Sequence, residues 1–230
     1  MTTTIDVVVP TLNAASGLAR TIASLGGGCD HDLVLRVTVC DGGSCDDTLA
    51  IARAAGAAVV ATSPGRGRQL AAGAAAGRAP WLLFLHADTT LGAGWADAAR
   101  RFMAEPSNAA RAGYFRLQFD SRDPRARRVE RLVAWRCRTF GLPYGDQGLL
   151  MSRAFYQGLG GFHLMPLMED VDLVRRIGRA NLVSLDADVV ASARRYERDG
   201  WVLRPLRNLS CLALFSAGVP VSVVRRLYDG

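Results

Sequence analysis

Acidic side chains follow two short apolar runs in the first half of this sequence. The run Trp81–Leu85 leads into His86 and Asp88, and the run Leu33–Cys40 leads into Asp41. A carboxylate in such a place can accept hydrogen bonds from a nucleobase or ribose, or can hold a divalent metal ion. Asp88 taken alone could equally cap the helix that is expected after it, so its chemistry depends on what else reaches the same place.

A second acidic group lies far along the chain. Glu169, Asp170 and Asp172 are three acids within four residues, at the start of an expected helix. One interpretation is structural, because negative charge at a helix N-terminus complements the helix dipole. The other is catalytic, with one carboxylate acting as a general base, and Asp172 is then expected to position the helix.

The elements that carry these residues alternate between strand and helix. Short apolar runs indicate buried strands, and apolar residues at helical spacing indicate helices. Strands are predicted at Ile5–Val9, Leu33–Cys40, Ala57–Thr62 and Trp81–Leu85, and helices from Ser16 to about Leu25, over Thr48–Ala55, from Gly65 to about Ala76 and over Gly94–Met103. This alternation predicts an α/β fold with a parallel sheet covered by helices on both faces.

Local signals set the predicted ends of these elements. Pro10 is expected to end the first strand, because proline has no N–H to give to a sheet. Ser16 is a candidate cap for the first helix, and Ser44 with Asp47 resembles a capping pair for the second.

The strand ends converge on one edge of the predicted sheet. Pro10–Asn13, Asp41 and Asp88 all fall at the carboxyl edge, where open α/β sheets bind their ligands. A dinucleotide-binding motif would need GxGxxG directly after the first strand, but no glycine stands there before Gly17. A P-loop is absent as well. The sequence therefore predicts a nucleotide site built from acidic strand ends and a basic loop.

The second half contains two predicted strands, Ala112–Phe119 and Leu149–Ser152, and a basic helix. The segment Asp123–Phe140 carries six arginines and has apolar residues at helical spacing. A solvated surface helix is the general expectation, and contact with an anionic membrane or a lipid-phosphate acceptor is the alternative. The apolar stretch Leu209–Val224 is predicted to be a packed helix that breaks near Pro220.

Composition excludes several classes of protein. Hydrophobic residues make up 50% of the 230 residues, which excludes general disorder, and all 28 basic residues are arginine, giving a net charge of +7. This balance favours anionic ligands, but without an aromatic platform it does not make a nucleic-acid site. Five cysteines without CxxC spacing indicate neither a disulfide framework nor a zinc site. With no signal-peptide features and no apolar span of roughly 20 residues, a cytoplasmic protein is expected.

Several motifs, taken in order, resemble those of a known family. VVVPTLN (7–13), CDGGSCDDT (40–48), LFLHADT (83–89) and MEDVDL (168–173) are similar to motifs of the GT-A fold, family 2 glycosyltransferases. GRGRQ (65–69), PYGDQG (143–148) and PLMED (166–170) resemble a short, single-domain bacterial subfamily. The resemblance runs from about Ile5 to Tyr228. It implies a GT-A, Rossmann-like and mainly parallel sheet flanked by helices, with a C-terminal helical segment.

The resemblance also implies an organisation and an activity. Residues 1–230 would form a single GT-A-like domain, with a nucleotide-binding half (1–110), an acceptor half (111–200) and a C-terminal helical segment (201–230). The implied reaction is an inverting transfer of a sugar from a UDP- or GDP-linked donor to an acceptor hydroxyl, assisted by Mg²⁺ or Mn²⁺. The acceptor could be lipid-linked or anionic, which would fit peripheral contact with the inner face of the membrane.

Individual residues receive roles from the same resemblance. Asp170 is implied as the general base, with Glu169 as second candidate, and Asp88 as the metal ligand. His86 stands where the family's DxD motif has its first aspartate. Asp146 and Gln147 are expected to face the acceptor or the donor sugar. Nucleotide-sugar binding is expected from Pro10, Thr11, Asn13, Asp41, Gly43, Arg66, Arg68, Gln69, His86 and Ala87, with Asp41 meeting the nucleobase. Apart from the resemblance, the basic pair Arg194 and Arg195 could close over the diphosphate or could equally be solvated at the surface.

Two other functions remain open at this point. A nucleotidyltransferase shares this kind of sheet, but it should carry a glycine-arginine loop after the first strand, where Pro10–Asn13 stands. A non-catalytic protein that binds a nucleotide-sugar or a lipid head group is compatible with His86 in the place of an aspartate.

Overall fold

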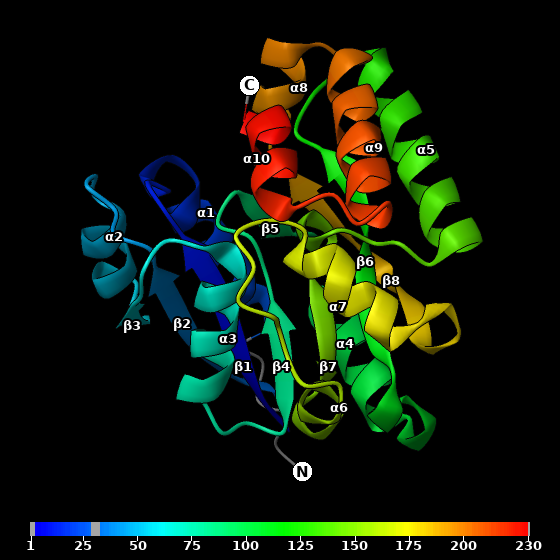
Figure 1. Ribbon diagram of the computed structural model, residues 1–230. Coiled ribbons are helices and arrows are strands. Elements are labelled where there is room, and N and C mark those ends of the chain that lie inside the picture. The colour runs from blue at the N-terminus through cyan, green and yellow to red at the C-terminus, as the bar shows by residue number, and fades with distance from the viewer. Residues whose placement is uncertain (1–2, 29–32, 230) are drawn as a thin grey trace.

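The computed structural model describes residues 3–28 and 33–229, in which eight strands form one sheet with helices on both faces (Figure 1). The strands are β1 (Thr3–Thr11), β2 (Leu33–Asp41), β3 (Ala58–Ala61), β4 (Trp81–Phe84), β5 (Thr89–Leu91), β6 (Ala112–Phe119), β7 (Leu149–Ser152) and β8 (Leu182–Ala191). Their order across the sheet is β3-β2-β1-β4-β7-β6-β8-β5. The predicted α/β fold is confirmed.

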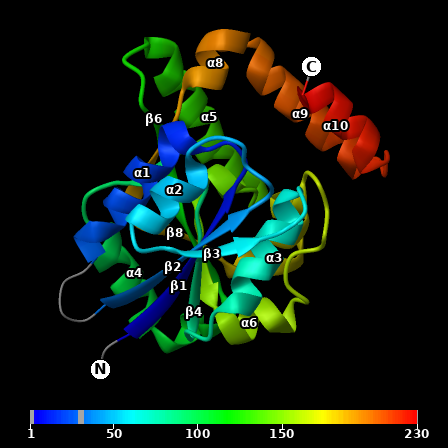
Figure 2. The ribbon, with the colours of Figure 1, turned by 90° about the vertical axis from the view of Figure 1, so that its left-hand side faces the viewer.

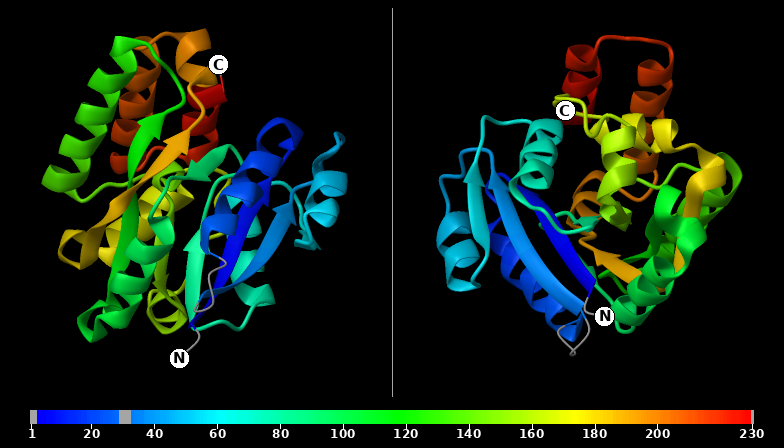
Figure 3. Two further views of the ribbon diagram at one scale, coloured as in Figure 1. Left: turned by 180° about the vertical axis from the view of Figure 1, so that it is seen from behind. Right: turned by 90° about the horizontal axis from the view of Figure 1, so that it is seen from below.

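The sheet is mainly parallel and curled (Figure 3). Strands β3, β2, β1 and β4 run parallel to one another, as the alternating pattern predicts. Strand β7 pairs antiparallel with both β4 and β6, and β5 pairs antiparallel with β8. The sequence analysis predicts neither β5 nor β8. Strand β5 has only three residues, and β8 carries Asp186 and Asp188, a residue type that is depleted in strands.

Helices cover both faces of the sheet, with α1 and α3 on opposite sides of the β1–β2 region (Figures 2 and 3). The helices are α1 (Ala15–Ser24), α2 (Thr48–Ala54), α3 (Arg66–Ala76), α4 (Trp95–Ala104), α5 (Pro124–Phe140), α6 (Arg153–Gly158), α7 (Glu169–Ile177), α8 (Arg194–Asp199), α9 (Leu203–Ser216) and α10 (Val221–Asp229). Short 3-10 turns occupy Leu25–Gly28, Pro106–Ala110, Gly145–Gln147 and Arg179–Asn181. None of the helices in residues 3–28 and 33–229 has both the length and the apolar character needed to cross a bilayer.

The C-terminal segment is two helices, as the break predicted near Pro220 requires. The first of them, α9, begins at Leu203, six residues before the predicted start at Leu209. The early residues of α9 include Arg204 and Arg207, so they fall outside the apolar stretch on which the prediction rested.

The core lies on both faces of the central strands and includes one buried ion pair. Val8, Leu82 and Met151 are fully buried in it. Asp6 is 1% exposed, and its carboxylate accepts a hydrogen bond of 2.5 Å from Arg153. An arginine from the second half of the chain therefore fixes a residue of β1.

The prediction that Pro10 ends the first strand is wrong. Strand β1 continues to Thr11, and Pro10 lies opposite Cys40 of β2. Backbone polar groups alternate sides along a strand. Val8 accepts a hydrogen bond from the Leu85 N–H on the β4 side, so the nitrogen of Pro10 points to that side too. The pairing with β4 ends at Val8, so the missing N–H costs the sheet nothing.

Both capping predictions are also wrong. Ser16 lies within the first turn of α1, and the side chain of Asp47 makes no capping hydrogen bond to α2. Instead, one side chain of the loop before α2 accepts hydrogen bonds from the first residues of both helices. Asp46 accepts from Ala15 N–H at 3.1 Å in α1, and it also accepts from the N–H of Thr48, the first residue of α2, at 3.1 Å.

Gly17 of α1 allows the helix to touch the loop that carries Asp88. A Cβ atom added at Gly17 would lie 2.6 Å from the carbonyl oxygen of Ala87 and 3.2 Å from Asp88 Cα. Both neighbours are backbone atoms, which cannot rotate out of the way. The position of Asp88 therefore depends on a residue without a side chain in α1.

Gly17→Ala is expected to destabilise the protein by about 1–3 kcal/mol, because the added methyl group overpacks a rigid contact. The free energy of unfolding in urea measures this effect. Gly158→Ala is the matched control, because Gly158 is also helical and an added Cβ atom there meets nothing within 4 Å. Equal stability of the two variants would show that the approach of α1 to Ala87 is not tight.

Candidate functional site

One large cleft lies at the carboxyl ends of β1 and β4. Its volume is about 640 Å³, which is in the range of small-molecule and cofactor sites. Its walls come from the segments after β1 and β4, the starts of α3 and α7, the turn at 144–146 and the helices α8, α9 and α10. Figure 2 shows α9 and α10 together at the end of the molecule away from the N-terminus.

Most of the residues predicted for the site line this cleft. They are Pro10, Thr11, Asn13, Arg66, Gln69, His86, Ala87, Asp88, Asp146 and Asp170. Five predicted residues are not among those lining it, namely Asp41, Gly43, Arg68, Gln147 and Glu169. Direct contact of these five residues with a ligand stays a prediction.

Asp41, at the end of β2, is buried and engaged in four hydrogen bonds. Its Oδ1 accepts from Thr11 Oγ1 at 2.9 Å and Ser44 Oγ at 2.5 Å, and its Oδ2 accepts from the N–H groups of Gly43 at 2.9 Å and Ser44 at 2.8 Å. Burial by itself would raise the pKa of Asp41. The hydrogen bonds outweigh burial and hold the pKa below its ordinary value. Asp41 is therefore an anion that shapes the loop after β2.

Two buried glutamines connect neighbouring elements. Gln69 Nε2 donates to the carbonyl oxygens of Thr11 at 2.5 Å and Cys40 at 2.9 Å, and so joins the ends of β1 and β2. Gln147 Nε2 donates to the carbonyl oxygen of Phe115 at 3.0 Å. The amide of Gln147 is thus used inside the protein, between the turn at 145–147 and β6.

Asp88 is exposed in the cleft, while the backbone around it is held on two sides. Thr21 Oγ1 of α1 donates to the carbonyl oxygen of Ala87 at 2.8 Å. The N–H of Ser192, just after β8, donates to the carbonyl oxygen of Asp88 at 3.2 Å. The loop is therefore fixed through its main chain, and the carboxylate remains accessible to a ligand.

His86 is a neutral imidazole at pH 7. Burial and the charge of Arg66 lower the pKa of His86 to about 4, against the opposing effects of Asp88 and Asp170. A neutral imidazole offers one acceptor nitrogen, which can bind a metal ion or accept a hydrogen bond. A Cβ atom on Gly145 would lie 2.5 Å from His86 Nε2, so any larger residue at 145 would displace the imidazole.

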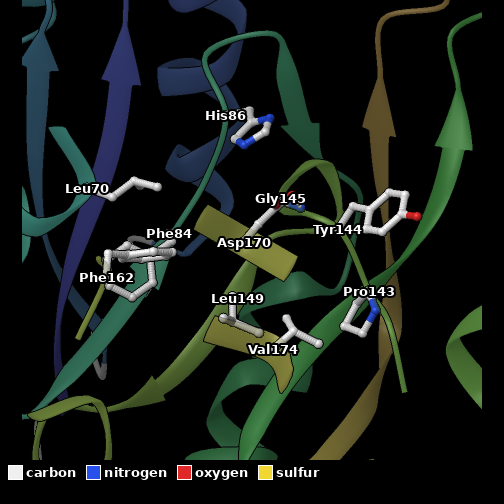
Figure 4. A pocket seen from close by; sticks show the side chains of 10 residues that line it. All are labelled: Leu70, Phe84, His86, Pro143, Tyr144, Gly145, Leu149, Phe162, Asp170 and Val174. Atoms are coloured by element: carbon white, nitrogen blue, oxygen red, sulfur yellow. Dashed lines mark hydrogen bonds between the residues drawn. The ribbon is translucent and has the colours of Figure 1, made fainter. Parts of the chain in front are cut away.

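Asp170, His86 and Gly145 together line a small apolar cavity (Figure 4). Its Oδ2 accepts from the Gly145 N–H at 2.8 Å, and its Oδ1 accepts from the Val171 N–H at 2.8 Å. The cavity, about 20 Å³ in volume, is also lined by Leu70, Phe84, Leu149, Phe162 and Val174. It has room for about one water molecule. Apolar side chains thus back the imidazole and the carboxylate.

Asp146 is a partly buried acid on the same cleft. Burial, with smaller contributions from Asp170 and Asp88, raises the pKa of Asp146 to about 6, although Arg136 opposes the shift. Its Oδ1 is buried and has no hydrogen-bond partner. The residue itself lines the cleft.

Helix α7 begins at a strained residue and directs its first acids to different places. Met168, just before α7, has a φ of 63°, which is uncommon for a residue other than glycine. Glu169 is 0% exposed and lies 3.5 Å from Arg66, whereas Asp170 reaches the cleft. Asp172 pairs with Arg176 at 2.6 Å, which is consistent with a role in positioning the helix.

The C-terminal helices supply cleft residues that the sequence analysis did not identify, among them Arg204, Asn208, Arg225 and Tyr228. Arg204 is 4% exposed, lies over the ring of Tyr228 at 4.4 Å and pairs with Asp199 at 3.2 Å. Helical periodicity indicates which positions are buried but not what they pack against, so no sequence pattern could have identified this group. Arg194 and Arg195 line the cleft as well.

The residues of the cleft fit a divalent metal that is shared with a substrate. Within residues 3–28 and 33–229, no three His, Cys, Asp or Glu side chains are grouped so that they could hold a metal ion alone. Mg²⁺ is commonly bound through one or two carboxylates together with substrate phosphates and water. The exposed carboxylate of Asp88 and the cleft-lining carboxylate of Asp146 are oxygen donors of this type.

Known structures share this fold. Glucosyl-3-phosphoglycerate synthase from Mycobacterium tuberculosis, in complex with Mn²⁺, UDP and glucosyl-3-phosphoglycerate, has a TM-score of 0.62 and 22% identity, over 95% of this chain and 81% of that one. Its complex with Mg²⁺ and UDP has a TM-score of 0.63 and 21% identity, over 95% and 80% of the two chains. S. aureus TarS has a TM-score of 0.63 and 15% identity, over 99% of this chain and 42% of TarS. This chain thus spans less than half the length of TarS.

Sequence comparison identifies the family. No curated protein matches the sequence. A family model described as glycosyl transferase family 2 matches residues 6–157, which include most of β1 and Asp41, Asp88 and Asp146. Because the match covers well over half of the sequence, this chain belongs to glycosyl transferase family 2.

Proposed function

We propose that this protein transfers a sugar from a nucleotide-diphosphate sugar to an acceptor hydroxyl, with inversion at the anomeric carbon. The observation that carries the proposal is that the strand-end residues, Asp88 and Asp170 share one cleft of about 640 Å³. An inverting transfer needs a donor site and a base within reach of the same carbon atom. The family match supports glycosyl transfer as the reaction class.

The proposed donor is a UDP- or GDP-linked sugar, bound where β1 and β4 end. Thr11 and Asn13 line that part of the cleft, and Arg66 brings positive charge to it. The structures of glucosyl-3-phosphoglycerate synthase with UDP and Mn²⁺ or Mg²⁺ support a UDP donor and a divalent metal. Asp88, with Asp146 nearby, would hold the ion. When bound, the metal neutralises charge on the diphosphate leaving group.

Asp170 is the proposed general base. The acceptor oxygen forms a bond to the anomeric carbon while the bond from that carbon to the diphosphate oxygen breaks, and Asp170 takes the hydroxyl proton. Its two hydrogen bonds, from Gly145 and Val171, fix the carboxylate and leave lone pairs for that proton. Attack opposite to the departing diphosphate gives inversion.

Glu169 is a weaker candidate for the base. Its side chain is fully buried and does not line the cleft, so an acceptor hydroxyl has no path to it. Its contact with Arg66, at 3.5 Å, instead links the start of α7 to the start of α3. We assign Glu169 to the positioning of Arg66.

Asp170→Asn is expected to lower turnover by about 10²–10⁴-fold while nucleotide binding is retained, because the amide keeps the shape but cannot take a proton. The test uses UDP- and GDP-sugars with Mn²⁺. Slow donor hydrolysis, with water as acceptor, reports turnover, and thermal shift reports binding. Asp186→Asn is the control, since the Asp186 side chain is 80% exposed and outside the cleft.

Two results of that test would contradict the proposal. Full activity of Asp170→Asn would remove the base assignment. Donor binding without hydrolysis by the wild-type protein, for every donor and metal, would indicate a non-catalytic nucleotide-sugar binding protein instead.

Asp88→Ala is expected to remove most of the gain in UDP affinity that Mn²⁺ gives the wild-type protein, a loss of at least about tenfold. Titration calorimetry with UDP, with and without Mn²⁺, measures it. Binding without metal should not weaken, because the Asp88 carboxylate then only repels the diphosphate. Asp186→Ala should behave as wild type, and an unchanged Mn²⁺ effect in Asp88→Ala would place the metal elsewhere.

Glu169→Gln is expected to remove a pH dependence of stability. Burial, partly offset by Arg66, raises the pKa of Glu169 from 4.5 to about 7. The folded protein therefore holds this proton more tightly than the unfolded chain, so the stabilising contribution is complete below pH 4.5 and is lost as pH rises through 7. Over that range the unfolding free energy of the wild type should fall relative to Glu169→Gln, by at most about 3 kcal/mol. Parallel pH profiles would contradict this.

A further inference from the structure

The exposed apolar side chains of this protein are concentrated at one end. Eleven large apolar side chains are exposed among the described residues, and all but Leu12 and Leu164 lie on α5, on α10, or on α9 and the residue before it. Figures 1 and 2 show α5, α9 and α10 together at the end of the molecule away from the N-terminus. Exposed apolar residues gathered in this way mark an interaction site more often than chance exposure.

Six of these residues lie on α5 and α9, and together with the exposed arginines of α5 we call them the apolar-basic face. They are Leu132, Trp135 and Phe140 on α5 and Leu203, Leu206 and Leu209 on α9. The rings of Trp135 and Phe140 contact each other with centroids 5.3 Å apart. This aromatic pair is about half exposed to solvent.

The polar part of the face is strongly basic. Arg128, Arg131 and Arg138 of α5 are exposed beside Leu132 and Trp135. The acid of this helix, Glu130, has a side chain that is only 12% exposed and is occupied by Arg127 and the Phe119 N–H. Solvent therefore meets arginine and apolar side chains on α5.

We propose that the apolar-basic face docks on an anionic lipid bilayer. Arginines with tryptophan, phenylalanine and leucine on one helix are the signature of segments that lie in the interface of a membrane, with the rings at head-group depth. The arginines supply attraction to anionic lipids, and the apolar side chains enter the acyl boundary.

A second copy of the chain fits this face less well. Two copies joined through it would bring the exposed arginines of one α5 against those of the other, in a protein whose net charge is already +7. Like charges brought together without counter-charges oppose association. An anionic surface satisfies both the charge and the apolar area.

The test is sedimentation of the full chain with vesicles of phosphatidylcholine, with or without phosphatidylglycerol. We expect partition onto anionic vesicles to exceed that onto neutral ones, and to weaken as salt is added. Arg131→Gln should lower it by about fivefold. Arg101→Gln, which removes an exposed arginine from α4 at the other end of the molecule, should leave it less affected.

A leucine pair tests the apolar contribution. Leu132→Ser should weaken binding to anionic vesicles, whereas Leu164→Ser should not. The two leucines are 60% and 62% exposed, and Leu164 lies outside the face. Because both are exposed, neither change threatens folding, which thermal unfolding verifies.

Trp135 gives a direct reading of insertion. It is 52% exposed, whereas Trp95 and Trp201 are buried and Trp81 is half-buried. Its emission should shift to shorter wavelength with anionic vesicles, and Trp135→Phe should lose the shift while still sedimenting with them.

Four outcomes would overturn the proposal. Equal partition onto neutral and anionic vesicles, or none onto either, is the first. Equal effects of the paired variants are the second. The third is an unchanged Trp135 emission on bound vesicles. The fourth is a dimer in vesicle-free solution that Leu132→Ser dissociates, which would show that a second copy covers the face.

Discussion

Backbone groups left unpaired where parallel strands end are the constraint on which this site depends. A sheet satisfies its own N–H and C=O groups only as far as its strands run side by side. Where the strands end, side chains must provide the hydrogen-bond partners of the backbone groups. Asp41 accepts from the N–H groups of the next loop, and Gln69 adds a second donor to the carbonyl oxygen of Thr11, which already accepts from Gly42, and also donates to that of Cys40. These two side chains hold the rim of the cleft in shape.

Acids near the rim consequently divide into two kinds. Asp41 is buried with four hydrogen-bond donors around it, so it is stabilised as an anion. Glu169 is buried and Asp146 is partly buried, both with too few donors, so their pKa values rise. The same burial thus has opposite consequences, according to whether donors accompany it. Only the second kind keeps lone pairs for other partners, and of these two acids Asp146 opens onto the cleft.

The sequence predicted the strand edge and the cleft residues more reliably than it predicted their local contacts. Apolar runs fix strands, so β6 and β7 were placed to the residue, and the edge with Asp88 followed from parallel order. Ser44 looked like a helix cap because its spacing from Asp47 is right. In the structure its hydroxyl donates to Asp41, a partner that only the pairing of elements reveals.

The remaining parts of the site depend on packing that no local pattern encodes. Strand β5 is too short to leave a signal, and the aspartates of β8 are tolerated because Arg116 of β6 pairs with both Asp186 and Asp188. In the sequence, Arg204 and Tyr228 look like ordinary helix residues. Only the packing of α9 and α10 against the cleft shows that they line it. Residues that are close in space but far apart in sequence account for nearly all of what was missed.

The pairing of β5 with β8 has a consequence for the order in which the chain assembles. Thr89, the residue after Asp88, pairs with Ala191, and Ser192 holds the carbonyl oxygen of Asp88. A chain emerging from the ribosome has made β1 to β4 long before it makes these partners. Its central strands can associate early, but the loop with Asp88 must wait until nearly the whole protein has been synthesised. Long-range pairing of this kind slows folding, and here it makes the proposed metal-binding loop one of the last parts to be completed.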